Sequence, residues 1–562
     1  MSLQAHAKRC APMQSKVPPP LFPHQTALLE ETWQHEAFAI FWECGCGKTA
    51  PTIHTAVRLY NAGKIDGAVV IAPRGVHRAW VSDEIPRHCA IEWNGLDWHS
   101  DRGKGQDRAL AELLNNQQKL LFFACTFEGI ITARGRAAVL AFKEKCPRFM
   151  LVIDEGSRVK NPTALRTKKV AALRKLARYV RLLNGTPSTN SALDVYAQMK
   201  ILDENYWVRH GIGSWTAFQA RFAVMKKIVV GGEDDRDDNK VKTSKRDPIV
   251  PHGAGDVDLY EQLDLESIGN VSSTLIEKHQ PNGDVSSSAA EKHQPTIGRT
   301  IEVVVGFREL DRLREMLQPM SSRLTKEAAG LNLPPKLYSR ILFDLHPEQR
   351  RAYDQLRREY MLELDSGTLV TATLALVRVL RLQQLACGFL PDVENPDAPP
   401  QLFPRDGHDP RIEHLLELCE DLPPSIIWAR FTYDIDRITR ELGPARCVRY
   451  DGEVSGPKRE IALDRFRSGK ARFIIAKAAS MGVGLTINEA SAHVFYSNTF
   501  SLLDRVQAED RSHRPGQHKA VTYYDLIAAR TVDEKILRSL RESKNISDQL
   551  TGDSYRAWLE EG

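Results

Sequence analysis

One stretch near the N-terminus, residues 41–49, constrains the fold more than any other part of this sequence. It reads Phe-Trp-Glu-Cys-Gly-Cys-Gly-Lys-Thr, follows an apolar run at 37–41 and precedes a helical pattern at 50–59. A strand, a turn with glycines and Gly-Lys-Thr at the start of a helix is the layout of a phosphate-binding loop. In such a loop backbone N–H groups surround the phosphates at the positive end of a helix dipole.

The residues of this loop define the chemistry that we expect from it. Lys48 would neutralise the β- and γ-phosphates of a nucleotide, and the Thr49 hydroxyl would bind Mg²⁺. Trp42 occupies the position of the first glycine in the full pattern, so an ordinary turn is an alternative for the motif alone. The backbone contacts to the phosphates would come from Gly45, Cys46 and Gly47.

The composition is that of a soluble protein with several domains. Of the 562 residues 42% are hydrophobic and 27% charged, and the net charge of +5 permits a polyanionic partner without requiring one. The nine cysteines lack the spacing of a metal site or a disulfide framework, and no apolar stretch is long enough for a membrane span or a signal peptide. We therefore expect a cytoplasmic protein of a bacterium or of a virus-infected host, or a nuclear one in a eukaryote, with no membrane contact.

Short apolar runs alternate with helical patterns over residues 21–227, which predicts a parallel sheet covered by helices. The expected strands are at 68–72, 120–125, 149–153 and 179–183. Ligands of such sheets bind beyond the carboxyl ends of the strands. The polar and turn-forming residues at those ends are Pro73, Arg74, Thr126, Asp154, Glu155 and the Gly-Thr-Pro sequence at 185–187.

Asp154 and Glu155 form a second expected site. Two carboxylates directly after a buried strand would cost free energy of burial unless they have a function or a partner. Asp154 can bind Mg²⁺, and Glu155 can orient or deprotonate an attacking water. Helix capping by Asp154 is the structural alternative. Gln25, which opens a helix expected to end near His35, could bind an adenine edge through its amide or could simply begin a surface helix.

The character of the sequence changes between residues 228 and 300. An acidic run at 233–238 precedes a basic one at 240–246, and the segment 271–281 recurs in similar form at 285–295. Such polar sequence has little apolar surface to bury, which predicts a mobile insertion rather than part of a core. Binding of a protein partner through this segment is the alternative.

Helical patterns follow the insertion, and a second alternation of strands and helices begins near Arg411. The helices are expected at 307–317, 347–364 and 371–385, with a connector at 333–336 and a proline-rich linker at 391–410. The second set of strands is expected at 426–429, 447–450, 473–476, 493–496 and 521–527. This half has no phosphate-binding loop, but Arg511 and Arg514 would share one face of a helical stretch. They could stabilise charge on the γ-phosphate of a nucleotide bound by the first sheet, or belong to a salt-bridged surface helix.

The motifs, in this order, resemble those of the Swi/Snf family of DNA translocases within helicase superfamily two, in particular its short bacterial and viral members. The resemblance extends from about Leu21 to Leu540, and its most specific match is the segment 507–517. The other matching segments are Gln25, 43–49, 71–73 with Trp80, 126–127, 154–161, 185–187 with Asn190, 450–452 and 482–485. The sequence departs from the family with Gly156-Ser157 in place of Ala-His, with 500–502 in place of Trp-Asn-Pro, and with Thr486 and Asn488 where Asn and Thr are usual.

The resemblance implies an α/β fold of two RecA-like parallel-sheet lobes in tandem, with helical insertions between them. The expected divisions are an N-terminal arm at 1–20, the ATP-binding lobe at 21–227, the insertion at 228–300, helical protrusions and a linker at 301–410, the second lobe at 411–545 and a tail at 546–562. The implied catalytic residues are Lys48, Asp154, Glu155, Arg511 and Arg514. Gly484 and Gln507 would join Gln25 and the loop in binding ATP, and the implied DNA contacts are Pro73, Arg74, Thr126, Lys160, Thr486 and Asn488.

The function implied is that of a monomeric ATPase that uses ATP and Mg²⁺ to translocate on double-stranded DNA without sequence preference. It would thereby remodel DNA or protein–DNA complexes. A helicase that separates DNA or RNA strands is one alternative. An inactive DNA-binding scaffold is another, which the presence of all five catalytic residues disfavours.

The composition of the insertion generates a first prediction. Deletion of about residues 232–298 should leave folding and DNA-stimulated ATP hydrolysis largely intact, because few core contacts should be lost. Thermal melting and ATPase rates of the shortened chain test this expectation. A large fall in melting temperature, or an insoluble product, would show that the segment packs against the rest of the protein.

Overall fold

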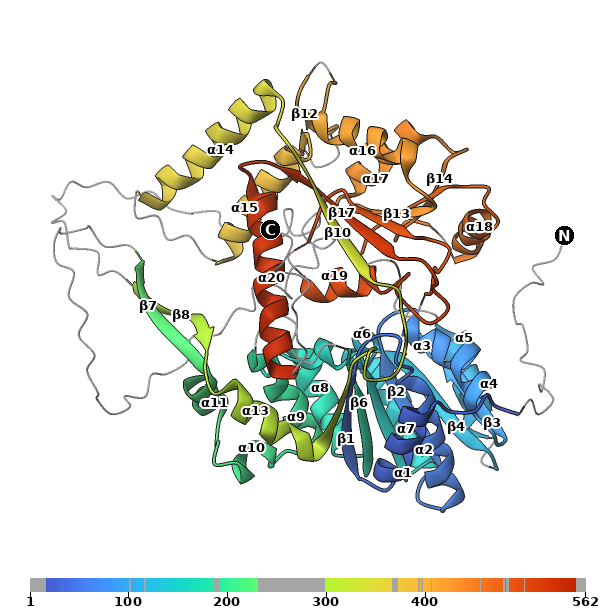
Figure 1. Cartoon of the computed structure of the whole chain (residues 1–562). Helices are drawn as coiled ribbons and strands as arrows, with labels where there is room; N and C mark the ends of the chain where they lie inside the picture. Colours follow the sequence, from blue (N-terminus) through green and yellow to red (C-terminus); the bar gives the residue numbers. More distant parts are fainter. Residues whose placement is uncertain are drawn as a thin grey trace, which may run out of the picture.

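The computed structural model of the protein describes residues 17–551 except for 101–102, 116–117, 186–191, 231–298, 366–371, 393–394, 396–397, 406, 455, 479–480, 482–484 and 500. Two parallel sheets, each covered by helices, form two lobes that lie one above the other in Figure 1. This arrangement confirms the predicted fold class of two parallel-sheet α/β lobes in tandem.

The first lobe is built on a seven-stranded parallel sheet with the strand order β3-β4-β2-β5-β6-β1-β9. Its strands are β1 Ala37–Trp42, β2 Gly67–Ala72, β3 Trp93–Asp97, β4 Leu120–Thr126, β5 Phe149–Asp154, β6 Tyr179–Leu183 and β9 Ser321–Leu324. Every residue of β2, β5 and β6 is buried, as expected for strands with helices on both faces. The ends of β1, β2, β4 and β5 therefore meet at one edge of the sheet.

The helices of this lobe include two that carry or adjoin the phosphate-binding loop, α1 Pro23–Thr32 and α2 Thr49–Asn61. The others are α3 Val76–Ala79, a π-helical turn at Trp80–Glu84, α4 Ile85–His88, α5 Lys104–Leu114, α6 Phe127–Ile131, α7 Ala133–Lys145, α8 Leu165–Arg174, α9 Val195–Leu202, α10 Tyr206–Arg209, α11 Trp215–Phe222 and α13 Leu310–Leu317. Single turns of 3₁₀ helix occur at Gly156–Val159, Ala192–Asp194 and Gln318–Met320.

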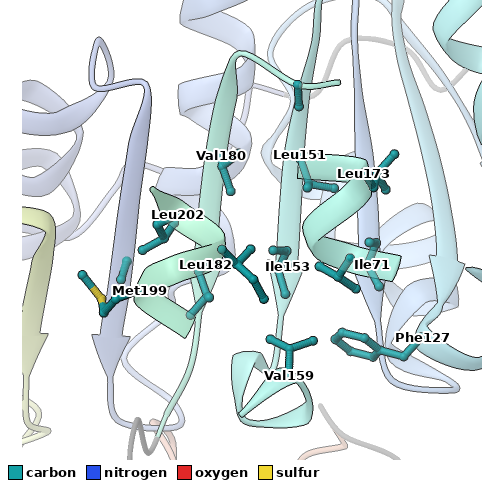
Figure 2. Close-up of a cluster of buried hydrophobic side chains, with 14 of the residues drawn as sticks. Ile71, Phe127, Leu151, Ile153, Val159, Leu173, Val180, Leu182, Met199 and Leu202 are labelled. Atoms are coloured by element: carbon teal, nitrogen blue, oxygen red, sulfur yellow. The ribbon is translucent and has the colours of Figure 1, made fainter. Parts of the chain in front are cut away.

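A hydrophobic cluster holds α8 and α9 against the sheet. Figure 2 shows Leu151 and Ile153 of β5 and Leu182 of β6 pointing toward Leu173 of α8 and Met199 of α9. A shift of either strand by one residue would turn these side chains away from the helices, so burial fixes the register. The register in turn places Asp154 at the end of β5.

The second lobe is built on a six-stranded parallel sheet with the order β10-β17-β16-β13-β15-β14. Its strands are β10 Lys336–Phe343, β13 Ser425–Trp428, β14 Cys447–Tyr450, β15 Phe473–Ala476, β16 Ala492–Phe495 and β17 Val521–Ala528. The helices are α14 Pro347–Asp365, α15 Ala372–Ala386, α16 Pro410–Asp421, α17 Thr432–Leu442, α18 Gly456–Arg467, α19 Leu502–Glu509 and α20 Val532–Thr551, and β11 Phe389–Leu390 pairs with β12 Gln401–Leu402.

The expectation that 301–410 holds only helical protrusions and a linker is wrong. Strand β9 completes the first sheet beside β1, and β10 forms an edge of the second sheet beside β17. The sequence of β9, Ser-Ser-Arg-Leu, is short and half-buried, so it has no apolar pattern that marks a strand. The connector between the lobes is therefore the short segment 325–335.

Two further divisions differ from the expected ones. Strands β7 Ala223–Val230 and β8 Arg299–Phe307 form an antiparallel ribbon at the base of the predicted insertion, whose residues 231–298 lie outside the described ranges. Helix α20 continues to Thr551, past the expected boundary at 545, and packs against α13 of the first lobe (Figure 1). None of the helices in the described ranges is both long and apolar enough to span a membrane.

Arg181 on β6 fixes the position of α1. It is 1% exposed, and its guanidinium donates hydrogen bonds to the backbone oxygens of Thr32 (2.7 Å), His35 (2.9 Å) and Trp33 (3.3 Å). These oxygens lie at and beyond the C-terminal end of α1, where no intrahelical donor remains. Burial lowers the pKa of Arg181 to about 10, which leaves it charged at neutral pH.

Substitution Arg181→Met should therefore destabilise the first lobe by about 3 kcal/mol, the scale of hydrogen bonds to a buried charged group. Urea denaturation followed by tryptophan fluorescence measures this loss. Arg178→Met is the matched control, because Arg178 pairs with Glu36 at the surface and both side chains are more than half exposed. Equal losses in the two variants would contradict the role of Arg181.

Candidate active site between the two lobes

The phosphate-binding loop connects β1 to α2, and the side chain at its end hydrogen-bonds to the backbone at its start. Gly45 and Gly47 have φ angles of 95° and 76°, which favour glycine. The Lys48 ammonium donates to the backbone oxygens of Trp42 (2.9 Å) and Glu43 (3.4 Å). Trp42, at the position of the missing first glycine, ends β1, and its indole donates to Ser322 Oγ of β9 (2.9 Å). The loop thus begins from a strand residue that is fixed by packing.

Residues of α1 hold the loop from the side. The Gln25 amide donates to Gly47 O (3.0 Å), and its oxygen accepts from the Phe22 N–H (2.9 Å). A methyl group on Gly47 would lie 2.3 Å from Gln25 Nε2, so this contact requires glycine. His24 Nε2 lies 3.0 Å from Cys46 O. The structure therefore places Gln25 against the loop, and its contact with adenine stays a prediction.

Asp154 ends β5, Glu155 follows it, and both are buried. Asp154 Oδ2 accepts from the Trp80 indole (2.8 Å), and Oδ1 accepts from the Glu155 N–H (3.0 Å). Glu155 has the left-handed backbone angles φ 60° and ψ 62°, and among the described residues its Oε2 has no hydrogen-bond partner. A strained residue with an unsatisfied buried oxygen is typical of a functional position.

Burial raises the pKa of both carboxyl groups above their ordinary values. For Asp154 the hydrogen bond from Trp80 and the charge of Lys48 act in the opposite direction. For Glu155 the charge of Asp154 adds to the rise, and Lys48, Arg158 and Arg511 oppose it. Lys48 and an arginine of the second lobe are therefore close enough to influence the same carboxylate.

Arg511 and Arg514 lie in the turn after α19, which ends at Glu509, so the expectation that they lie on a helix is wrong. The Arg514 guanidinium donates to the backbone oxygen of Asp510 (2.7 Å), which holds the chain in a tight turn. Arg511 is 2% exposed, and its side-chain hydrogen bond among the described residues is a long one to Leu485 O (3.4 Å). Burial and the neighbouring Arg514 lower the pKa of Arg511 to about 10.

This turn of the second lobe lies directly on the phosphate-binding loop of the first. A methyl group on Gly45 would lie 3.7 Å from Arg514 Cγ and from Pro515 Cδ. Arg511 is within electrostatic reach of Glu155 and Cys44. The five predicted catalytic residues thus come together between the lobes: Lys48, Asp154, Glu155, Arg511 and Arg514.

The donor set between the lobes suits a magnesium ion bound together with phosphates. Thr49, the first residue of α2, offers a hydroxyl, and Asp154 and Glu155 offer carboxylate oxygens, one of them without a partner among the described residues. Mg²⁺ prefers such oxygen ligands and usually keeps waters or substrate phosphates in its coordination shell. In the described ranges, no cluster of three or more His, Cys, Asp or Glu side chains could hold a metal by itself. The residues therefore fit Mg²⁺ that arrives with a nucleotide.

Three of the predicted DNA contacts lie at neighbouring strand ends of the first lobe. Pro73 and Arg74 follow β2, Arg74 is exposed, and Thr126 ends β4, where it pairs with Ala72. The Thr126 hydroxyl accepts from the Gly129 N–H (2.9 Å) and so caps α6. Lys160 is 7% exposed, with its ammonium 3.9 Å from Asp194. The DNA contacts of all four stay predictions.

The predicted residues of the second lobe support the arginine turn. Thr486 Oγ1 accepts from Arg514 (3.2 Å), and Asn488 Nδ2 donates to Pro515 O (3.0 Å). Gln507 is buried on α19, while Gly484 lies outside the described residues, as do Asn190 and the last two residues of the Gly-Thr-Pro sequence, Thr186 and Pro187. Their contacts with DNA or ATP therefore also stay predictions.

The structure explains one departure from the family pattern and adds a residue that the sequence did not indicate. A methyl group on Gly156 would lie 2.5 Å from Leu182 Cδ2, so alanine does not fit at this position. The added residue is Lys326 of the connector, which forms an ion pair with Asp510 (2.7 Å). It lies in a polar segment without a motif, and only the placement of β9 brings it to the site.

Two family models match this chain, one in each lobe. Residues 28–241 match the family model of the SNF2-related domain, and residues 410–516 match that of the helicase conserved C-terminal domain. "Chromodomain-helicase-DNA-binding protein 1-like" of Mus musculus is 21% identical over 90% of this chain and 47% of its own length. "Probable ATP-dependent DNA helicase CHR12" of Arabidopsis thaliana is 22% identical over 90% of this chain and 39% of its own length.

Among solved structures, the SWI2/SNF2 ATPase core of Sulfolobus solfataricus in complex with dsDNA aligns over 97% of both chains, with 19% identity and a TM-score of 0.35. The chain spans less than half the length of the curated relatives it matches.

The environment of Glu155 generates a prediction about stability and pH. Because its pKa in the folded protein is raised above the ordinary value of 4.5, ionisation opposes folding at higher pH. Glu155→Gln should therefore raise the melting temperature at about pH 8, and the gain should shrink as the pH falls and vanish only below 4.5, where the carboxyl becomes protonated in the unfolded as well as in the folded state. Calorimetry over this range measures the effect.

Glu128→Gln is the control for this measurement, because the Glu128 side chain is 60% exposed and its substitution should change stability little at any pH. A gain from Glu155→Gln that does not depend on pH would contradict the assignment of a raised pKa.

Proposed function

The chain belongs to the Snf2 family of helicase-like ATPases, and we propose on that basis that it hydrolyses ATP between its two lobes and uses the energy to translocate on duplex DNA. The observation that carries this proposal is the contact of the Arg511–Arg514 turn with the phosphate-binding loop. A nucleotide held by one lobe would meet charges supplied by the other. Hydrolysis of that nucleotide would then change how the two lobes are positioned relative to each other.

Each residue has a defined task in this reaction. Lys48, which now donates to carbonyls of its own loop, would exchange these bonds for the β- and γ-phosphates. Thr49 and Asp154 would bind Mg²⁺, which neutralises phosphate charge when it is present. Glu155 would orient the attacking water and accept its proton, a role that its raised pKa favours. Arg511 and Arg514 would stabilise the charge that develops on the γ-phosphate.

The partner in this proposal is duplex DNA. A single copy of the chain would bind it without sequence preference. The exposed Arg74 and the half-buried Thr126 would contact the DNA backbone at one edge of the first sheet. Two relatives bear names that include DNA binding or DNA helicase activity. Contacts to phosphates would make binding sensitive to salt.

Two other functions compete with translocation. A strand-separating helicase would share the ATP site, so only its response to forked or single-stranded substrates would distinguish it. An inactive DNA-binding scaffold would have no use for the strained, incompletely hydrogen-bonded Glu155 or for the buried Arg511. These costs support an enzyme over a scaffold.

Substitutions in the two lobes should separate ATP binding from turnover. Lys48→Ala should weaken ATP binding, because phosphate charge is no longer neutralised. Arg511→Ala or Arg514→Ala should lower kcat on the order of 10³-fold and change ATP affinity little, because these arginines act mainly in the transition state. Titration of a fluorescent ATP analogue and steady-state hydrolysis with no nucleic acid, single strands, duplex, forked DNA and RNA provide both quantities.

Arg440→Ala is the control, because Arg440 lies in the same lobe with its side chain 68% exposed and should leave both quantities unchanged. Near wild-type turnover by the Arg511→Ala, Arg514→Ala double variant with duplex DNA would contradict the two-lobe reaction. Stimulation by forked DNA or RNA alone would favour the helicase alternative.

A further inference from the structure

The connector between the lobes begins beside the phosphate-binding loop. The Glu43 N–H donates to Leu324 O (2.9 Å), which continues the pairing of β1 with β9. Two residues beyond Leu324, the Lys326 N–H donates to the side chain of the same glutamate, at Glu43 Oε2 (2.9 Å). A methyl group on Gly45 would lie 3.8 Å from Lys326 Cε. The backbone and the side-chain stem of Lys326 are therefore fixed to the loop of the first lobe.

The charged end of the same side chain lies in the second lobe. The Lys326 ammonium donates to Asp510 Oδ1 (2.7 Å) and His513 O (2.9 Å) and lies 3.3 Å from His513 Nδ1. These three acceptors satisfy its three N–H groups, and the side chain is only 6% exposed. Asp510 directly precedes Arg511, and its backbone oxygen accepts from Arg514. Lys326 thus bridges the loop and the turn that carries both arginines.

A second lysine pairs with the same carboxylate from within the second lobe. Lys336 donates to Asp510 Oδ1 (3.2 Å) and to Glu509 Oε2 (3.0 Å). Lys336 begins β10, which pairs with β17, so its ion pairs lie within the second lobe. Burial would raise the pKa of Asp510, but the two lysines outweigh it and hold this pKa well below the ordinary value. The contact through Lys326 differs from that through Lys336 because it joins the two lobes.

We propose that Lys326 is a positioning residue that couples the phosphate-binding loop to Arg511 through Asp510. The inference rests on the proposed ATP hydrolysis between the lobes. Arg511 needs such support, because its long hydrogen bond to Leu485 O would not by itself hold the guanidinium in one place. Without the bridge, movement of the loop on binding ATP would no longer be transmitted to the turn. Binding of ATP would persist, and turnover would fall.

Lys326→Met and Lys336→Met test this proposal as a matched pair in the full chain. Each removes one ammonium from Asp510 and keeps a similar side-chain stem. Lys326→Met should lower kcat with duplex DNA about 100-fold, the cost of a misplaced catalytic group, and change the affinity for a fluorescent ATP analogue less than about threefold. Lys336→Met should lower kcat by less than about threefold, although both variants lose an ion pair with the same carboxylate.

A double-mutant cycle completes the experiment, and its Asp510→Asn variant keeps the proposal testable if Lys326→Met folds poorly. Asp510→Asn keeps the shape of the side chain and should lower kcat as Lys326→Met does, while the double variant should be no slower than either. Equal losses of kcat in Lys326→Met and Lys336→Met, or a Lys326→Met rate within about threefold of wild type, would overturn the proposal. A wild-type chain without DNA-stimulated hydrolysis would instead refute the proposed function, and the inference with it.

Discussion

The contact between the phosphate-binding loop and the turn at 510–515 is the interaction on which the candidate site depends. Gly45 has a positive φ, which favours glycine, and a methyl group there would lie at an ordinary van der Waals distance, 3.7 Å, from Arg514 Cγ and from Pro515 Cδ. In the proposed reaction each lobe supplies part of the site: the first supplies Lys48, Asp154 and Glu155, and the second supplies Arg511 and Arg514. Their contact unites the two parts.

This arrangement has an electrostatic cost. Burial raises the pKa of Asp154 and Glu155 and lowers that of Arg511, so each group is less stable as an ion here than in water. The left-handed backbone of Glu155 adds strain. Polyphosphate and a divalent cation would supply the opposite charges that these groups lack, which is why the cost is consistent with a binding site rather than with a structural core.

Much of this architecture could be predicted from the sequence. Apolar runs such as 149–153 located the central strands, the phosphate-binding-loop pattern selected Lys48, and the rule that ligands bind at the carboxyl ends of strands selected Asp154 and Glu155. Strand β9 could not be predicted in the same way, because it is short, polar and half-buried. Its partner strand is β1, and the paired residues Phe41 and Arg323 are 282 positions apart in the sequence. Pairing over such separations leaves no local pattern.

The conformation of the segment that carries the two arginines could not be predicted from the sequence either. The spacing of Arg511 and Arg514 suggested a helix, but the hydrogen bond from Arg514 to Asp510 O stabilises a turn instead. Lys326 carries no motif at all and reaches Asp510 only because β9 brings the connector to the loop. Motifs therefore identified the groups proposed to contact phosphate, whereas the residue proposed to position them was found only in the three-dimensional structure.

The most direct test of a site shared by both lobes compares two affinities: that for ADP with aluminium fluoride and that for ADP alone. Aluminium fluoride mimics the phosphoryl group during its transfer. If both lobes form the site, the wild-type chain with duplex DNA should bind the mimic at least about tenfold more tightly than ADP. Arg511→Ala should abolish this preference and leave the affinity for ADP unchanged. A preference that persists undiminished in the Arg511→Ala variant would contradict a reaction site shared by the two lobes.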